Sequence, residues 1–232
     1  MSAPDLGDRF YDAWVALSRR LGIDPIALAR VSFAETGMYR RHPRNAAAGV
    51  WPFIESTLRR LGWSGSAVDF TALAPEDQLP YLERYLQPYA GRLRDDAAIY
   101  VVMFLPARLS AALAGGDGTV LTTRGDPSRF YEWNTILDRD GDGVITVGDL
   151  RRHMDIMVRG ERWNTIAGEV QTRASGVPGV LAAPGTALRR ILPVALVAGA
   201  GMLVWYFYAT DEGARTRQRT ERRIDDLFGS RA

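Results

Sequence analysis

Residues 24–37 read DPIALARVSFAETG, and this stretch decides how the first half of the chain folds. Asp24 is of a type favoured at helix N-caps, and Pro25 suits the first helical position because an N–H there has no partner within the helix. Apolar residues follow, and Gly37 can adopt the left-handed conformation that ends many helices. The stretch therefore predicts an apolar helix that ends before Gly37 and carries the carboxyl group of Glu35 in its last turn.

Helical patterns continue on both sides of this stretch. Apolar residues recur at helical spacing over residues 5–21, and Pro75 is placed to open a helix further on. Residues 115–126 are expected to form a loop, and no segment alternates convincingly as a strand would. The soluble part of the chain is therefore predicted to be all-α. Further helices are expected at residues 53–61, 95–105, 128–137 and 147–172.

The composition is that of a folded chain rather than a disordered one. Hydrophobic residues make up 47% and charged residues 24% of the 232 residues, and the formal net charge is only +2. The chain has Arg but no Lys, and because the arginines are scattered among acids we expect no nucleic-acid partner. The absence of Cys excludes disulfides, zinc thiolates and a thiol nucleophile.

Residues 191–209 read ILPVALVAGAGMLVWYFYA and carry no charge. Their number is close to the roughly 20 residues that cross a bilayer as a helix, and aromatic residues lie near one end, where membrane helices are enriched in them. A buried core helix is the alternative. We expect a single transmembrane helix, preceded by a flexible linker at residues 173–190 and followed by a basic polar tail at residues 210–232. Residues 1–172 would form the soluble domain.

The chemistry expected of Glu35 follows from its place at the end of an apolar helix. The helix dipole disfavours a carboxylate there, and shielding from water would further favour the protonated form. A protonated carboxylic acid is what cleavage of a glycosidic bond requires, because the leaving oxygen must take up a proton. The alternative is a solvated acid at a helix end without a chemical role.

The order of residues around Glu35 resembles the active-site region of the lysozyme-like lytic transglycosylase superfamily, which includes phage muramidase-like proteins. In that family an apolar helix ends in Glu-Ser, followed by a Gly, a polar loop and a Gly-apolar-x-Gln-Phe segment. Thr36 keeps the hydroxyl of the usual Ser, whereas Pro52 replaces the usual Gln and removes a polar side chain and an N–H. The resemblance covers roughly residues 5–160. The corresponding residues are Glu35-Thr36-Gly37, a loop, and Gly49-Val50-Trp51-Pro52-Phe53.

The resemblance implies a lysozyme-like, mainly helical fold and an enzyme that cleaves peptidoglycan. Glu35 would protonate the glycosidic oxygen between N-acetylmuramic acid and N-acetylglucosamine. The same carboxyl group would then act as base while the muramyl 6-hydroxyl attacks C1, which gives a 1,6-anhydro product. The resemblance also implies a saccharide groove whose substrate-binding residues are Thr36, Gly49, Trp51, Phe53 and Tyr100.

Two other functions compete with a lytic transglycosylase. A hydrolytic muramidase would place water at the bond, often with a second carboxylate. Asp69, Glu76 and Asp77 are candidates for that second acid, but all are better explained as helix caps or first-turn acids, which favours the transglycosylase. The third hypothesis is a calcium-stabilised membrane structural protein with an inactive lysozyme-like domain, which the replacement at Pro52 keeps open.

Residues 138–149 read DRDGDGVITVGD and match the twelve-residue EF-hand loop. Three carboxylates this close repel one another unless a cation lies among them, so we expect a structural Ca²⁺ site rather than a solvated acidic turn. An Asp at the last position is shorter than the usual Glu, so binding would be weak, and Mg²⁺ is the alternative ion. The expected ligands are Asp138, Asp140, Asp142, the backbone carbonyl of Val144, and Asp149.

The charges beside residues 191–209 bear on where the protein lies. The tail is rich in Arg, and by the positive-inside rule this favours a cytoplasmic tail and an outward-facing enzyme. No apolar signal segment is visible in residues 1–20. Lipid-containing phages carry membrane-bound peptidoglycan-cleaving enzymes in the virion, and a phage protein would explain both features. The hypothesis is a single-pass protein of a phage virion inner membrane, with the lipid bilayer, other virion membrane proteins and peptidoglycan as partners. The alternative is a bacterial inner membrane with the enzyme facing the periplasm.

Overall fold

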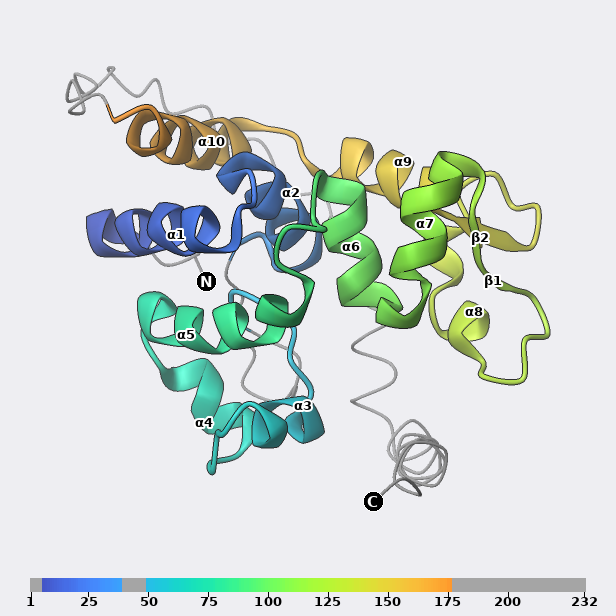
Figure 1. Cartoon of the computed structure of the whole chain (residues 1–232), viewed down its shortest axis with the longest axis horizontal. Helices are drawn as coiled ribbons and strands as arrows, with labels where there is room; N and C mark the ends of the chain where they lie inside the picture. Colours follow the sequence, from blue (N-terminus) through green and yellow to red (C-terminus); the bar gives the residue numbers. More distant parts are fainter. Residues whose placement is uncertain (1–5, 39–48, 177–232) are drawn as a thin grey trace, which may run out of the picture.

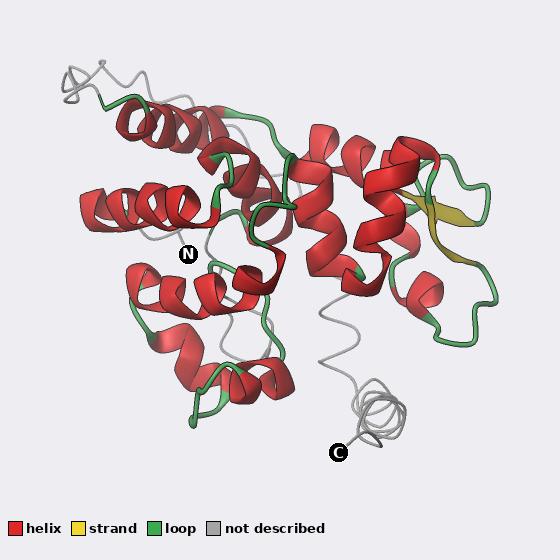
Figure 2. Cartoon of the chain, viewed as in Figure 1, coloured by secondary structure: helices red, strands yellow, loops and turns green. Residues whose placement is uncertain are grey.

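The computed structural model describes residues 6–38 and 49–176, and the statements on structure below concern these residues. The described part is mainly helical, as predicted (Figure 2). Short 3-10 turns lie between several helices. The two strands, β1 (Val120–Thr123) and β2 (Val144–Thr146), form an antiparallel ribbon. The α-helices are α1 (Gly7–Leu21), α2 (Pro25–Thr36), α3 (Glu55–Arg60), α4 (Ala67–Ala72), α5 (Pro75–Leu86), α6 (Asp96–Phe104), α7 (Leu109–Gly115), α8 (Phe130–Trp133), α9 (Val147–Met157) and α10 (Glu161–Ala174).

Helix α2 lies at the centre of the arrangement. It packs against α1, α6, α9 and α10, and α1 packs in turn against α5 (Figure 1). Buried residues occur on every side of α2, from Ala27 near its start to Thr36 at its end. A helix that is apolar all round is stable only when other elements cover it, which is the case here. The β ribbon, α7 and α8 lie at the far end of the molecule from α1.

The two ends of α2 are formed as the sequence predicts. The side chain of Asp24 accepts a hydrogen bond of 2.9 Å from the backbone N–H of Ile26, and Pro25 occupies the first turn. At the other end Gly37 has φ 65°, in the left-handed region, and its N–H donates to the carbonyl of Phe33. These local bonds fix where α2 begins and ends, and so place Glu35 in its last turn.

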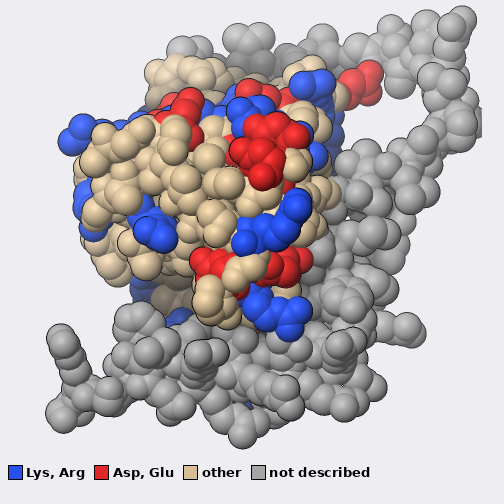
Figure 3. Space-filling model, turned by 90° about the vertical axis from the view of Figure 1, so that its right-hand side faces the viewer, with Lys and Arg blue, Asp and Glu red and all other residues tan. Residues whose placement is uncertain are grey.

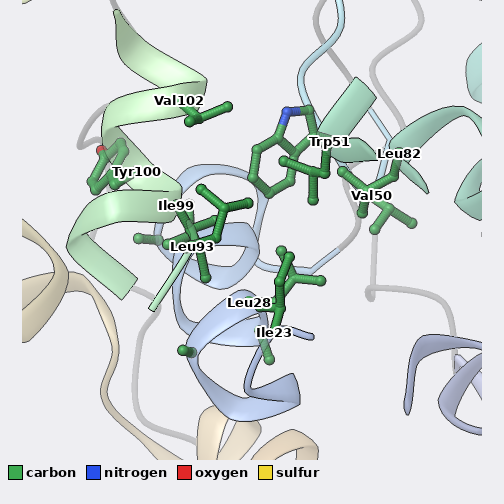
Figure 4. Close-up of a cluster of buried hydrophobic side chains, with 14 of the residues drawn as sticks. Ile23, Leu28, Val50, Trp51, Leu82, Leu93, Ile99, Tyr100 and Val102 are labelled. Atoms are coloured by element: carbon green, nitrogen blue, oxygen red, sulfur yellow. The ribbon is translucent and has the colours of Figure 1, made fainter. Parts of the chain in front are cut away.

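The core between α2, α5 and α6 is built around a tryptophan. The ring of Trp51 lies between Leu82 of α5 and Val102 of α6 (Figure 4). Leu28 of α2 lies near the same cluster, and all four side chains are 2% exposed or less. Tyr100 points to the other side of α6, where its ring meets α9.

Several helices differ from the predictions. Residues 128–137 do not form one helix, because only the short α8 lies there, followed by a 3-10 turn. Residues 147–172 form two helices, α9 and α10, because the chain breaks between them at Gly160, which has φ 90°. Helix α10 ends at Ala174, two residues into the predicted linker. Helices α4 and α7 have no counterpart among the predictions.

The stretch 115–126 is not a plain loop, and the expectation of no strand is wrong. It contains β1, which pairs with β2 so that Thr122 lies opposite Ile145 and Thr123 opposite Val144, with an irregularity in register after Val120. The strands are 4 and 3 residues long, too short to show an alternating pattern. The ribbon ties the acidic stretch 138–149 to the chain segment that follows α7.

In the part of the chain that the structure describes, no helix is both long and apolar enough to cross a membrane. The predicted transmembrane segment 191–209 lies outside the described residues, as do the predicted tail 210–232 and most of the predicted linker. Residues 39–48, which include the loop expected between Glu35 and Gly49, also lie outside them.

Candidate active site and acidic loop

The carboxyl group of Glu35 is half-buried and held by a tyrosine. The hydroxyl group of Tyr100, on α6, donates a hydrogen bond to Oε1 of Glu35, on α2. Tyr100 is 1% exposed. Its burial raises the pKa of the phenol well above its ordinary value, and the charge and hydrogen bond of Glu35 add to the effect. The phenol therefore stays protonated at neutral pH, and acts as a hydrogen-bond donor to the carboxyl group.

The segment that starts at Gly49 lies against the last two turns of α2. The backbone carbonyl of Val50 accepts hydrogen bonds from Ser32 Oγ at 2.7 Å and from Thr36 Oγ1 at 3.2 Å. The hydroxyl of Thr36 also bonds back to the carbonyl of Ser32 at 2.9 Å. Both hydroxyls point inward from α2, so they fix the position of Gly49-Val50 relative to Glu35. The structure thus brings together the two halves of the predicted motif.

A buried glutamine, absent from the sequence predictions, holds the other side of the same segment. Oε1 of Gln78, on α5, accepts a hydrogen bond of 3.0 Å from the N–H of Val50, and its amide donates to the carbonyl of Leu73 at 3.3 Å. Gly49 has φ 110°, and a Cβ there would overlap Oε1 of Gln78. A polar residue on the buried face of α5, directly before Leu79, was the sequence feature that could have drawn attention to it.

The aromatic residues expected to bind substrate lie in the core. Trp51 and Phe53 are 2% and 3% exposed. The Phe53 ring packs edge-on against Tyr85 at 5.4 Å and Phe70 at 6.1 Å, and the Trp51 ring lies 6.5 Å from Tyr85. Tyr100 and Thr36 are buried as well. These side chains therefore form part of the packed interior behind the candidate site. Their contact with a saccharide stays a prediction.

The candidates for a second catalytic acid have structural roles. Asp69 forms a capping box with Ser66 at the start of α4, and hydrogen bonds from the Ser66 side chain and backbone lower its pKa. Glu76 and Asp77 lie in the first turn of α5, where the helix dipole favours acids. Glu76 also lies 3.8 Å from the guanidinium of Arg9. These positions agree with the sequence interpretation of all three as helix-start residues.

The acidic loop gathers three carboxylates at one point. One oxygen from each of Asp138, Asp140 and Asp142 lies within 4.8 Å of the others. Oδ1 of Asp138 accepts the N–H of Gly141 at 2.8 Å, and Oδ2 accepts the Tyr131 hydroxyl at 2.6 Å. The Tyr131 hydrogen bond is the main cause that lowers the pKa of Asp138. This donor set fits a hard divalent cation such as Ca²⁺ or Mg²⁺.

Asp149, the predicted last ligand, is already bonded within the protein. It is 1% exposed, and Oδ2 accepts the N–H and hydroxyl of Thr146 at 2.9 Å and 2.6 Å in a capping box that starts α9. Oδ1 lies 2.6 Å from the guanidinium of Arg152, which also lies 2.9 Å from Asp140. Burial acts to raise the pKa of Asp149, but these hydrogen bonds outweigh it and hold the pKa low.

Arg152 is therefore paired with the carboxylate that was expected to be the fourth side-chain ligand of a metal ion. Figure 3, which faces this end of the molecule, shows acidic and basic side chains next to one another on the surface. The three carboxylates at the start of the loop fit the ion, whereas Asp149 fits it only after it has parted from Arg152. The backbone carbonyl of Val144 follows the third carboxylate, in the strand β2.

Comparison of the chain with models of protein families, with curated proteins and with solved structures finds no match.

The contact between Gly49 and Gln78 predicts an unequal effect of alanine at two glycines. Gly91 also has a positive φ, 74°, but a Cβ there meets nothing within 4 Å. We expect Gly91→Ala to lower the free energy of unfolding by about 1 kcal/mol through backbone strain alone. Gly49→Ala should lower it by roughly 2–5 kcal/mol, because overlap with Gln78 adds to the strain. Urea unfolding of the full chain in detergent measures both.

A double variant checks the cause of the larger effect. Adding Gln78→Ala to Gly49→Ala removes the overlap, so the double variant should be less destabilised than the sum of the two single variants. Equal losses for Gly49→Ala and Gly91→Ala would show that Gln78 does not press on this position.

Proposed function

We propose that the chain is a membrane-anchored peptidoglycan-cleaving enzyme of the lytic transglycosylase type, with Glu35 as catalytic acid and base. The observation that supports it best is the hydrogen bond from the buried Tyr100 hydroxyl to the carboxyl group of Glu35. A carboxyl group that was merely exposed to water at a helix end would need no buried donor from another helix. The motif order around Glu35 and Gly49, which resembles that superfamily, adds to this support.

The proposed reaction uses one carboxyl group twice. Glu35, protonated, gives its proton to the oxygen between N-acetylmuramic acid and N-acetylglucosamine as the C1–O bond breaks. The resulting carboxylate then takes the proton of the muramyl 6-hydroxyl as that oxygen bonds to C1, which closes the 1,6-anhydro ring and restores the acid. Tyr100 orients the carboxyl group throughout. Its raised pKa keeps the phenol protonated, so the phenol cannot take up the proton that Glu35 transfers.

Water would have to attack C1 in a hydrolase, and a second carboxylate commonly activates it. Asp69, Glu76 and Asp77 are all placed at helix starts, and Oδ2 of Asp69 accepts hydrogen bonds from the backbone and the hydroxyl of Ser66. Their placement favours the intramolecular attack by the 6-hydroxyl. A muramidase, or an inactive domain with a structural role, remains as an outcome of the tests below.

We place a structural Ca²⁺ ion among Asp138, Asp140 and Asp142, with Mg²⁺ as the competing ion. The ion would neutralise three carboxylates that lie within 4.8 Å of one another. It would also anchor β2 and the start of α9, and so connect the end of the molecule that carries the ribbon to the helix that packs against α6. It takes no part in the proposed bond cleavage.

We further propose that residues 191–209 span the inner membrane of a phage virion, from which the enzyme opens the cell wall during genome entry. The support is the uncharged length of that segment and the basic tail that follows it. Detection of the chain in purified virions, with its release by detergent, would agree with this. Its absence from purified particles would favour the alternative of a bacterial inner membrane and an enzyme facing the periplasm.

The catalytic role of Glu35 predicts that an isosteric change abolishes wall cleavage. We expect Glu35→Gln in the full chain, purified in detergent, to lower the clearing of cell walls in a zymogram by about 10²–10⁴-fold, because glutamine cannot supply a proton. Glu161→Gln, at an exposed first-turn acid of α10, is the matched control and should keep wild-type activity.

Mass spectrometry of the digest separates the two enzymes. Anhydromuramic ends are expected for a transglycosylase, whereas reducing muramic ends would identify a muramidase. If wild type and Glu35→Gln clear walls equally, or if neither clears them, the enzymatic proposal is wrong.

Competition between Arg152 and a metal ion predicts opposite effects of two substitutions on Ca²⁺ binding. Asp142→Asn should weaken binding at least about tenfold, because it removes one charged ligand. Arg152→Gln should tighten Ca²⁺ binding several-fold. It removes a positive charge that repels the ion, and it frees the carboxylates of Asp140 and Asp149 to bind the ion. Calorimetric titration with Ca²⁺ alone measures both, and Asp77→Asn controls for the loss of one negative charge elsewhere. Equal binding by Asp142→Asn and wild type would rule out the site.

A further inference from the structure

A second polar contact lies behind Tyr100, on α9 and at the start of the acidic loop. The ring centroid of His153 lies 6.0 Å from that of Tyr100. Nδ1 of His153 lies within hydrogen-bond distance of the guanidinium of Arg139. Arginine can only donate, so Nδ1 is the acceptor, and in the neutral imidazole Nε2 carries the hydrogen. Four residues from three parts of the chain thus follow one another: Arg139, His153, Tyr100 and Glu35.

The protonation state of His153 is consistent with its role as acceptor from Arg139. Burial, and after it the positive charge of Arg139, lower the pKa of His153 to about 4. The ring is therefore neutral at neutral pH and able to accept the hydrogen bond. Burial dominates the raised pKa of Tyr100, but the charge of Arg139 acts on that phenol too, in the opposite direction. The guanidinium is therefore near enough to act on both rings.

The cluster is not the most stable way to fill this part of the core. Among residues 6–38 and 49–176, neither Nε2 of His153 nor Nε of Arg139 has a hydrogen-bond partner, although both atoms are buried. A buried donor without a partner destabilises the fold. A leucine at position 153 would fill a similar volume without the unpaired ring donor, although Arg139 would then lose its acceptor. A polar cluster that destabilises the fold and lies beside a candidate active site indicates a role other than packing.

We propose that Arg139 and His153 are positioning residues for the catalytic pair. His153 accepts from Arg139 and in this way is fixed beside the ring of Tyr100, whose hydroxyl orients the carboxyl group of Glu35. The proposal rests on the proposed function of Glu35. Because Arg139 lies between Asp138 and Asp140, the acidic loop supplies the outermost member of the chain of contacts that ends at the catalytic carboxyl group.

Two substitutions of His153 in the full chain separate positioning from packing. His153→Asn keeps an acceptor near the place of Nδ1 but leaves the core underfilled, whereas His153→Leu fills the core and removes the acceptor. We expect His153→Leu to melt near the wild-type temperature, because the gain from removing the unpaired ring donor offsets the lost acceptor of Arg139, and yet to lose about 10- to 100-fold in kcat on soluble glycan chains, with KM within about twofold. His153→Asn should melt lower and keep kcat within about threefold. The reverse order of activities would overturn the proposal, since that order is what packing alone requires.

A measurement on Tyr100 decides the point without using activity. Tyrosine labelled with ¹³C at Cζ gives one NMR signal for each ring, and Tyr100→Phe assigns the relevant one. Both His153 variants lack the ring current of the imidazole, so a difference between them reports the hydrogen bond. The Tyr100 signal of His153→Leu should differ from that of His153→Asn. Arg139→Met keeps the imidazole and its ring current, so a shift of its Tyr100 signal away from that of wild type reports the loss of the Arg139 contact, and it also covers the case in which His153→Leu does not fold. The same Tyr100 signal in His153→Leu and His153→Asn, or a wild-type signal in Arg139→Met, would overturn the proposal.

The two failures can be told apart. If Glu35→Gln cleaves walls as well as wild type does, the proposed function is wrong, and the NMR comparison still shows whether Arg139 and His153 hold Tyr100. If Glu35→Gln is inactive but His153→Leu retains full kcat, the function stands and the positioning role fails.

Discussion

The burial of α2 constrains every other part of the fold. Four helices pack against it, so each charged side chain that it carries must find a partner on one of them. The charged residues of α2 are Arg30 and Glu35. Arg30 lies 2.8 Å from Asp96 of α6 and 2.8 Å from Asp155 of α9, and Glu35 accepts from Tyr100 of α6. Both contacts reach α6, so the apolar helix and its two charges together fix how α6 lies against α2.

An arginine of its own also holds helix α9 to the same frame. Arg151 lies 2.7 Å from Asp95 and 3.1 Å from Asp96, at the start of α6, and 2.8 Å from Asp117 in the turn after α7. Tyr100 follows Asp96 by about one turn of α6, and His153 follows Arg151 by two residues on α9. The ion pairs and the contact between the two rings therefore join the same two helices. In this arrangement exposed charges, which are individually weak, act together as a network at a helix junction.

The sequence predicted α2 to the residue because every feature that defines it is local. Asp24, Pro25 and Gly37 each act within one turn of their own position. The ribbon of β1 and β2 was out of reach, since it depends on pairing between segments more than 20 residues apart and on strands of 3 and 4 residues. The break at Gly160 was readable in principle, because a glycine between two helical patterns allows the positive φ that the structure shows there.

The residues of the candidate site also fall into those set by local sequence and those set by distant contacts. Glu35 could be singled out because its chemistry is visible in the sequence next to it, whereas Gln78, Arg139 and His153 gain their roles only from residues distant in the chain. The burial of Trp51 and Phe53 was likewise invisible to a motif, because the pattern of a motif does not say which of its residues face inward. The pattern therefore proposed which segments form the candidate site, and packing decided which of their side chains are buried.

Asp149 connects the acidic loop to the helix that carries His153. It is the third residue of α9, and its carboxylate caps that helix through Thr146 while it pairs with Arg152. A cation among Asp138, Asp140 and Asp142 would draw on the same carboxylate, so filling the loop and starting the helix are not independent events. His153 lies one turn further along α9 than Asp149, and Arg139 lies inside the loop itself. Through Arg139 and His153, a rearrangement of the loop on ion binding would act on the ring of Tyr100, whose hydroxyl contacts Glu35.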